Sequence, residues 1–270
     1  MLGSHRVVIR GAGELASGVG VCLHSVGFQV VMTEISQPLA VRRGVSFAEA
    51  VYDGTARVEG ISARRVESGE QAIRLIGRRE LAVVVDPLAS LVAELRPTAL
   101  IDAIMAKRNV ATRVSDSPIV IGLGPGFVAG RDAHAVIETH RGHELGRIIW
   151  EGTAQPDSGQ PTIVMGQGAE RVLRAPAGGI IHWQAKIGDL VQAGHILGDV
   201  GEEPILAPFA GALRGAIREG REVTAGMKIG DIDPRNDSAA CFTISDKARA
   251  IGGATLQALL ILMQRLGHHC

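Results

Sequence analysis

The sequence predicts an α/β domain, then β-rich segments, and then a final helix. Residues 5–34 alternate between apolar stretches, a glycine turn and a stretch of helical periodicity, which is the pattern of a βαβ unit. From about residue 112, short strand candidates are separated by glycine-rich turns. Residues 172–200 recur 32 positions later, which indicates an internal duplication. We therefore expect four segments: an α/β domain over 1–111, a β-rich middle segment over 112–171, a duplicated β-module over 172–234, and a tail with a helix over 235–270.

Composition narrows the range of partners. Lys plus Arg and Asp plus Glu both number 28, so no net field would attract nucleic acid or an anionic membrane. Aromatic residues make up 3% of the chain, which disfavours stacking platforms for single-stranded nucleic acid. The expected partner is a small molecule or a protein, with no nucleic acid and no membrane.

The location is expected to be cytoplasmic. The first residues lack the apolar core and cleavage site of a signal peptide. The strongest apolar stretch, 256–263, is far shorter than the roughly 20 residues of a membrane helix. The three cysteines lie far apart without a C-x-x-C pair, which argues against a zinc knuckle and a disulfide framework.

The βαβ unit predicts a Rossmann-like domain with a nucleotide site. Two turn glycines, Gly11 and Gly13, allow a phosphate to approach the start of a helix, and Glu34 ends the second strand, where ribose hydroxyls are bound. The third glycine of the fingerprint is replaced by Ala16, which is tolerated there. The alternative is that the glycines only allow close packing. The residues expected at this cofactor site are Gly11, Gly13, Glu14, Ala16 and Glu34.

Two further groups could extend an anion site at the same edge of the sheet. Arg42 and Arg43 could clamp a phosphate or carboxylate, or form a solvated surface pair. Gly124 and Gly126 flank a proline in a loop suited to an anion nest, although ordinary turn chemistry explains them equally well. Strands at 81–87 and 98–104, with a helix after the first, predict a parallel sheet covered by helices.

The densest polar constellation lies in the segment "HAVIETHRGHELGR". On a strand, His134, Glu138 and His140 would share one face, with Arg141 and His143 on the adjoining turn. Such residues can bind a metal or act as acid and base, and they can equally anchor a polar loop. Because three convergent ligands cannot be inferred from proximity in sequence, no metal is assigned.

The tail contains a second polar set. Cys241, Asp246, Lys247 and Arg249 could line a site, with Cys241 as an acceptor of sulfur or selenium if a neighbouring cation lowers its pKa. The alternative is a buried, inert thiol. Because internal glycines weaken helices, the final helix is expected to start near Gly253. The candidate catalytic residues of the chain are His134, Glu138, His143, Cys241, Asp246 and Lys247.

The duplicated module resembles the biotinyl and lipoyl carrier family. Nine of 29 aligned positions are identical between the copies, mostly turn glycines and small residues in the pattern "AP..G" and "GD.V.AG". The resemblance implies a barrel-sandwich fold whose modified lysine would lie in the hairpin between the copies. That hairpin is Gly201, Glu202 and Glu203, so covalent biotin or lipoate is not expected, and docking or a structural role is.

The whole chain resembles the YqeB family of selenium-dependent molybdenum hydroxylase system proteins. The motifs that carry the resemblance include "RGAGELASG", "IDAIMAKRN", "HAVIETHRGH" and "ISDKARAIGG". The resemblance implies an accessory role in maturing molybdenum hydroxylases of the xanthine dehydrogenase type, without naming a reaction. The positions that match its motifs are Gly11, Gly13, Glu34, Arg42, Arg43, Asp102, Lys107, Arg108, Gly124, Gly126, His134, Glu138, Arg141, His143, Asp246 and Lys247.

The leading functional expectation combines these features. A maturation factor would bind a nucleotide, NAD-like or the nucleotide-bearing molybdenum cofactor, on its α/β domain and dock a hydroxylase client. The alternatives are a nucleotide-dependent oxidoreductase or a transferase of sulfur or selenium, and a scaffold without catalysis. A homo-oligomer is compatible with each of these.

Overall fold

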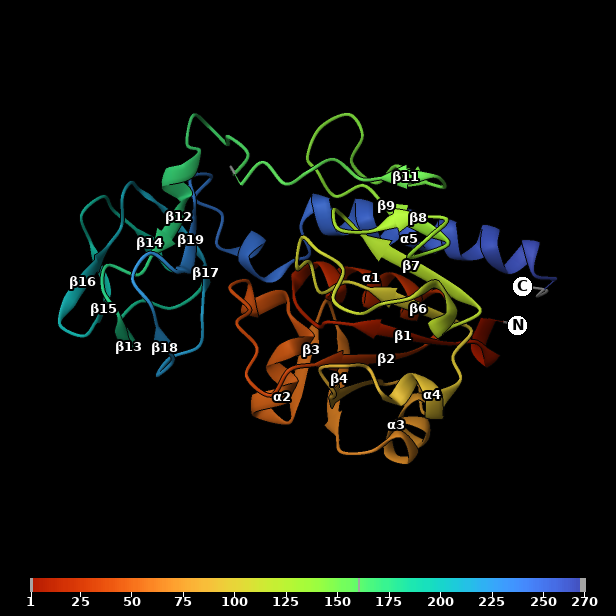
Figure 1. Cartoon of the computed structure of the whole chain (residues 1–270). Coiled ribbons are helices and arrows are strands. Elements are labelled where there is room, and N and C mark those ends of the chain that lie inside the picture. Colours follow the sequence, from red (N-terminus) through yellow and green to blue (C-terminus); the bar gives the residue numbers. More distant parts are fainter. Residues whose placement is uncertain (1, 160, 268–270) are drawn as a thin grey trace. The chain divides into compact units, whose positions relative to one another are not determined.

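A computed structural model describes residues 2–159 and 161–267 of the chain (Figure 1). The chain forms two compact units, of which the first comprises residues 1–38, 46–157 and 244–270, and the second 39–45 and 158–243. Each unit has its own sheets. The division into four segments stays a prediction.

The first unit is built on a nine-stranded mixed sheet in the order β10-β9-β7-β6-β1-β2-β5-β4-β3. The edge strands β3 and β10 run antiparallel to their neighbours, and the seven strands between them are parallel. A small separate sheet pairs β8 (Val128–Ala129) with β11 (Gly152–Thr153). The large sheet consists of β1 (Arg6–Arg10), β2 (Gln29–Glu34), β3 (Thr55–Val58), β4 (Ile61–Val66), β5 (Leu81–Val85), β6 (Ala99–Asp102), β7 (Ile119–Leu123), β9 (Ala135–Ile137) and β10 (Ile148–Ile149).

Helices cover both faces of this sheet, as the sequence predicts. In Figure 1, α1 (Glu14–Ser25) and α5 (Asp246–Arg265) lie side by side on one face, and α3 (Gly69–Ile76) and α4 (Leu91–Leu95) lie on the other. The short helix α2 (Ala50–Asp53) contacts β3, β4 and β5. Because the central strands are almost continuously apolar, both faces of the sheet can be buried under helices.

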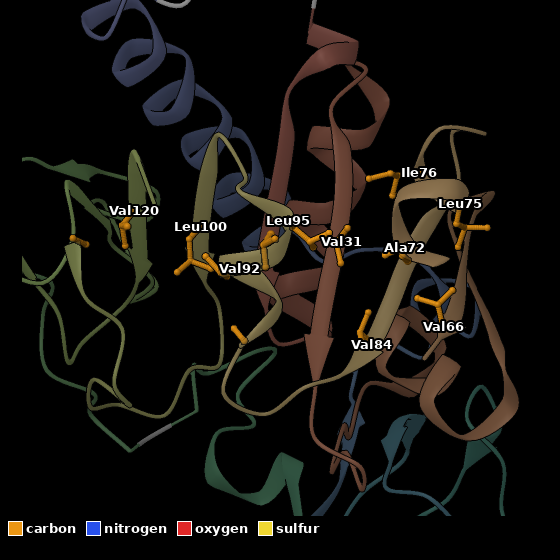
Figure 2. Close-up of a cluster of buried hydrophobic side chains, with 14 residues drawn as sticks. Val31, Val66, Ala72, Leu75, Ile76, Val84, Val92, Leu95, Leu100 and Val120 are labelled. Atoms are coloured by element: carbon orange, nitrogen blue, oxygen red, sulfur yellow. The ribbon is translucent and has the colours of Figure 1, made fainter. Parts of the chain in front are cut away.

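Figure 2 shows the core beneath α3 and α4. Leu75 and Ala72 of α3 and Leu95 of α4 pack in one buried cluster with Val31 of β2 and Leu100 of β6. These residues come from alternating positions of the strands and from one face of each helix, as the two periodicities require. The core therefore fixes the strands whose carboxyl ends form the site described below.

The start of α5 corrects one expectation from the sequence. The helix begins at Asp246, not near Gly253, and Ser245 caps it by accepting a hydrogen bond from the backbone N–H of Ala248. Gly252 is internal because α1 packs there: a Cβ atom would lie 2.9 Å from the carbonyl oxygen of Gly18. The close helix crossing offsets the usual cost of a glycine inside a helix, roughly 1 kcal/mol.

The second unit consists of two four-stranded antiparallel sheets, ordered β12-β19-β17-β14 and β16-β15-β13-β18. Apolar side chains of both sheets, among them Ile181, Leu197, Leu213 and Ile229, form one buried cluster. The strands are β12 (Val172–Arg174), β13 (Gly179–Trp183), β14 (Leu190–Val191), β15 (Ile196–Val200), β16 (Glu203–Leu206), β17 (Gly211–Ala216), β18 (Glu222–Val223) and β19 (Lys228–Asp233).

Some local predictions need correction. Within the expected β-rich segment, residues 161–166 form no strand and contribute only an isolated bridge between Val164 and Gln167. Other strands expected in the middle segment do form, but β7, β9 and β10 extend the large sheet of the first unit.

The short 3₁₀ helices are η1 (Leu2–Ser4), η2 (Arg43–Val45), η3 (Phe47–Glu49), η4 (Val114–Asp116), η5 (Ala169–Arg171) and η6 (Ala239–Phe242). Among the described helices, none has the length and apolar character needed to cross a membrane.

Candidate functional site

The carboxyl ends of the parallel strands form the candidate site. The chain leaves β1 through α1 toward β2 on one side, while β6 lies on the other side of β1. The crevice outside a sheet at such a reversal of strand order is where ligands bind in open α/β folds. The loops after β1, β2, β6, β7 and β9 and the first turn of α5 therefore supply the site residues.

The two turn glycines after β1 have different roles. Gly11 adopts φ +95°, and a Cβ atom there would lie 3.1 Å from the carbonyl oxygen of Ala103, so it allows the loops after β1 and β6 to pack together. Gly13 is the N-cap of α1, where no side chain caps the helix, and a Cβ atom there would meet nothing within 4 Å. The open start of the helix lies at Gly13. Ala16 is buried in α1.

Glu34 binds the loop that follows β1. Its carboxylate accepts a hydrogen bond from the backbone N–H of Ala12 at 3.1 Å and one from that of Ile35 at 2.7 Å. Burial raises the pKa of Glu34, and these two hydrogen bonds oppose the shift. The carbonyl of Ala12 accepts hydrogen bonds from the hydroxyls of Ser17 and Ser46. The loop is thus held from both sides, and the serines were not singled out by the sequence.

A buried polar network fixes the loop after β6. Arg10 donates to the carboxylate of Asp102 at 3.1 Å, to the hydroxyl of Thr112, and to the carbonyl of Val110 at 2.9 Å. The Thr112 hydroxyl donates to Asp102 at 2.6 Å, and all three side chains are buried. Arg10 ends the strand β1 and Asp102 ends the neighbouring strand β6. Opposite charges at the ends of two neighbouring strands are a pattern from which this network could have been predicted.

Gly124 and Gly126 pack closely on neighbouring loops. A Cβ atom at Gly124 would lie 2.5 Å from the Thr139 hydroxyl, and one at Gly126 would lie 2.6 Å from the Cα of Arg108. Both glycines have positive φ. Close packing with the loops after β6 and β9 accounts for them, and the anion nest stays a prediction.

Lys247 lies at the centre of a charged cluster. It is half-buried in the first turn of α5, and its surroundings include the charged groups of Glu14, Glu138, Arg141 and Asp157. Burial, followed by the charge of Arg141, lowers the pKa of Lys247, and the three carboxylates oppose this. Residues from α1, α5 and the loops after β9 and β11 thus converge on one amine.

The loop after β9 is tied down around this amine. The buried carboxylate of Glu138 accepts hydrogen bonds from the backbone N–H groups of His140 and Gln155, both at 2.7 Å. Arg141 forms a bidentate pair with Asp246, at 2.6 and 2.7 Å. Glu138, Asp246 and Lys247, three of the candidate catalytic residues, therefore lie at one edge of the sheet.

The histidines do not join this cluster as the sequence suggests. His134 precedes β9, so the strand separates it from Glu138, and its Nδ1 accepts a hydrogen bond from the N–H of Val120. Burial lowers the pKa of His134. The side chain of His143 is 91% exposed. Across residues 2–159 and 161–267, no three His, Cys, Asp or Glu side chains are close enough together to hold a metal ion.

Arg42 and Arg43 belong to the second unit. Arg42 donates to the carbonyls of Ala240 and Thr243 at 3.3 and 3.4 Å, and Arg43 donates to the carbonyl of Ala216 at 2.7 Å. These bonds tie the two arginines to the framework of that unit, and their role as a phosphate or carboxylate clamp stays a prediction.

Cys241 is a buried thiol of the second unit, whereas Asp246 and Lys247 lie in the first. Burial raises the pKa of Cys241, and the charges of Arg42 and Arg214 only partly oppose this. The cations expected from the sequence, Lys247 and Arg249, are not those that act on it. A buried thiol with a raised pKa is a poor nucleophile, which counts against transfer of sulfur or selenium through Cys241.

Comparisons with known proteins point to one relative. The chain is 49% identical over 263 residues to the "Uncharacterized protein YqeB" of Escherichia coli K12. The match covers 97% of this chain and 49% of that protein, so the chain spans about half the length of the curated relative. No protein-family model matches the chain.

Three solved structures are similar at low identity. TcdA (CsdL) is 13% identical with a TM-score of 0.35, covering 99% of this chain and 90% of its own. An aspartoacylase family protein from Mesorhizobium loti is 13% identical with a TM-score of 0.29, covering 84% of each chain. A succinylglutamate desuccinylase/aspartoacylase from Rhodobacter sphaeroides is 14% identical with a TM-score of 0.27 and the same coverage. The curated sequence match extends over almost all of this chain and makes it similar to about half of that YqeB protein.

Proposed function

We propose that the first unit binds a nucleotide at the carboxyl edge of its sheet, as part of an accessory protein for molybdenum hydroxylases. The observation that carries the proposal is the open start of α1 at Gly13, with Glu34 at the end of the adjacent strand β2. Backbone N–H groups and the helix dipole at such a start attract phosphate. A carboxylate at the end of the second strand accepts hydrogen bonds from ribose hydroxyls.

The strand order supports this assignment. The six strands β5-β2-β1-β6-β7-β9 follow the 3-2-1-4-5-6 order of Rossmann folds, in which dinucleotides bind across the reversal of strand order. A diphosphate would lie at Gly13, a nucleoside toward Glu34, and the other half of the ligand toward β6 and α5. NAD-like dinucleotides and the nucleotide-bearing molybdenum cofactor share this chemistry.

The accessory role rests on the resemblance to the YqeB family, and we propose that the second unit docks the client. A barrel-sandwich fold made by duplication is part of this proposal. Two observations support the duplication. A shift of 32 residues places β12, β13, β14 and β15 on β16, β17, β18 and β19. When the strands of each such pair are exchanged, the order β12-β19-β17-β14 becomes the order β16-β15-β13-β18 of the other sheet. The hairpin between the copies carries Glu202 and Glu203 in place of a lysine, which leaves docking or support as its role.

Calorimetric titration of the full chain with NAD, ATP, CTP and molybdopterin dinucleotides tests binding. The informative variant is Gly13→Asp, because Gly13 has extended backbone angles and Asp is a favourable N-cap residue. The new carboxylate would occupy the phosphate position and repel an anion. We expect unchanged or slightly higher stability together with loss of nucleotide binding.

Gly253→Asp provides the matched control, since a side chain at Gly253 also meets nothing within 4 Å and adds the same charge. It should leave nucleotide affinity unchanged. Binding of none of the four ligand types, or equal binding by the wild type and Gly13→Asp, would contradict the proposal. Client docking is tested separately, by co-purification of a hydroxylase with Glu202→Lys/Glu203→Lys and with the wild type.

A further inference from the structure

We infer that Lys247 is a reactive amine that condenses with a small carbonyl compound at the carboxyl edge of the first unit's sheet. This activity does not depend on nucleotide binding. It requires an amine that is partly accessible and not committed to a structural ion pair, and the half-buried Lys247 meets both requirements.

The position of Lys247 is unfavourable for an ordinary structural lysine. It is the second residue of a 20-residue helix, where the dipole disfavours a cation. Within the described residues, its amine forms no hydrogen bond and no ion pair closer than 4.0 Å, although carboxylates surround it. A side chain that violates local preference without a compensating bond is characteristic of functional sites.

Three of the four neighbouring charges are bound to other groups. Glu138 is held by two backbone N–H groups, Arg141 by Asp246, and Asp157 by an ion pair with Lys107. These bonds keep Glu138 and Asp157 from closing onto the amine of Lys247. Arg141 remains close enough to oppose protonation of the amine, together with burial. Burial and Arg141 together outweigh the three carboxylates, so the pKa of Lys247 lies below that of an ordinary lysine.

The chemistry follows from a neutral amine beside carboxyl groups. The nitrogen lone pair attacks the carbonyl carbon, and a proton passes from nitrogen to oxygen to give a carbinolamine. The carbon–oxygen bond then breaks, the oxygen takes up a proton and leaves as water, and a protonated imine remains on Lys247. Overall, an ammonium group and a carbonyl compound yield an iminium ion and water, with no oxidant or reductant.

Reductive trapping tests this inference, because the chain has only three other lysines, Lys107, Lys186 and Lys228, and all are exposed. The full chain is treated with glyoxylate and cyanoborohydride between pH 6 and 10, and peptide mapping by mass spectrometry gives the rate at each lysine. We expect labelling of Lys247 to reach its half-maximal rate at a lower pH than labelling of Lys186. Each unit of difference gives about tenfold more neutral amine at neutral pH.

Two variants make the result specific. Arg141→Met removes the neighbouring cation and should move the profile of Lys247 to higher pH. Arg147→Met, in the same loop, removes an exposed arginine paired with Glu144 and should not. Equal pH profiles at Lys247 and Lys186, or failure of glyoxylate to add to Lys247 at any pH, would overturn the inference. Neither result would bear on nucleotide binding, which Gly13→Asp tests.

Discussion

The carboxylate of Glu34 accepts a hydrogen bond from the backbone N–H of Ala12, and so joins the end of β2 to the glycine loop after β1. Fingerprint reasoning places Glu34 and the glycine loop at a nucleotide site, but does not show that the carboxylate of Glu34 is hydrogen-bonded to that loop. The same carboxylate retains lone pairs for ribose hydroxyls. One side chain can thus both position the phosphate loop and select the sugar.

Glu34→Gln should weaken the affinity for NAD by roughly tenfold, since a hydrogen bond to a charged acceptor contributes about 1.5–3 kcal/mol. Wild-type affinity should rise as pH increases through the pKa of Glu34, which burial holds above its ordinary value, because the ionised form is the better acceptor. The variant should lack that dependence. Calorimetry with NAD at several pH values measures both effects.

Asp86→Asn is the control for Glu34→Gln, because Asp86 follows the adjacent strand β5 and its carboxylate binds the N–H of Leu91. It should keep the wild-type pH dependence. NADP should bind more weakly than NAD, because its 2′-phosphate would approach the carboxylate of Glu34. Equal affinities for NAD of the wild type and Glu34→Gln would remove Glu34 from the site.

Replacement by alanine should change the free energy of unfolding in opposite directions at the two adjacent glycines of α5. Gly252→Ala places a Cβ atom 2.9 Å from the carbonyl oxygen of Gly18 in α1, whereas Gly253→Ala meets nothing within 4 Å. Overpacking costs about 1–3 kcal/mol, and replacing a helical glycine gains up to about 1 kcal/mol. Gly252→Ala should therefore lower the free energy of unfolding and Gly253→Ala should raise it. Urea denaturation measures both, and a shift of the same sign in both would refute the close helix crossing.

The sequence predicts those parts of the fold that local patterns specify. The strand, glycine turn, helix and strand over 5–34 form β1, α1 and β2, because apolar periodicity and the turn residues agree there. The segment 50–80 carries no such pattern. Its strands β3 and β4 alternate irregularly between exposed and buried residues, so α2, β3, β4 and α3 were not anticipated.

Contacts between residues far apart in the sequence could not be predicted from local patterns. Arg10 meets Asp102 and Thr112, 92 and 102 residues away, only after β1 and β6 have paired. The early start of α5 likewise depends on α1, because Gly252 of α5 packs closely against Gly18 of α1. Lys247 and Glu138 were both named from the sequence, but their common edge follows from the position of β9 beside β7 and from the packing of α5 on both strands.

The free energy of unfolding of the second unit should fall at acidic pH because of Asp233, which is buried at the end of β19. We call this fall between pH 4 and 2 the acid limb. Burial alone would raise its pKa, but hydrogen bonds from Arg235 and the charges of Arg235 and Arg214 outweigh burial and hold the pKa at about 2. The ordinary value is 3.8, so the folded state binds this proton less readily than the unfolded state. The resulting stabilisation, about 2 kcal/mol, is present above pH 4 and is lost as pH falls toward 2.

Asp233→Asn should therefore lower the free energy of unfolding of this unit at pH 7 by about 2 kcal/mol or more, and flatten its dependence on pH between 4 and 2. The chain has two tryptophans, so Trp150→Phe leaves Trp183, whose indole N–H donates to Ile217, as a fluorescence probe of the second unit. Asp199→Asn, at the half-buried end of β15, should keep the wild-type acid limb. An acid limb that is the same in Asp233→Asn and the wild type would show that the arginines do not stabilise this carboxylate.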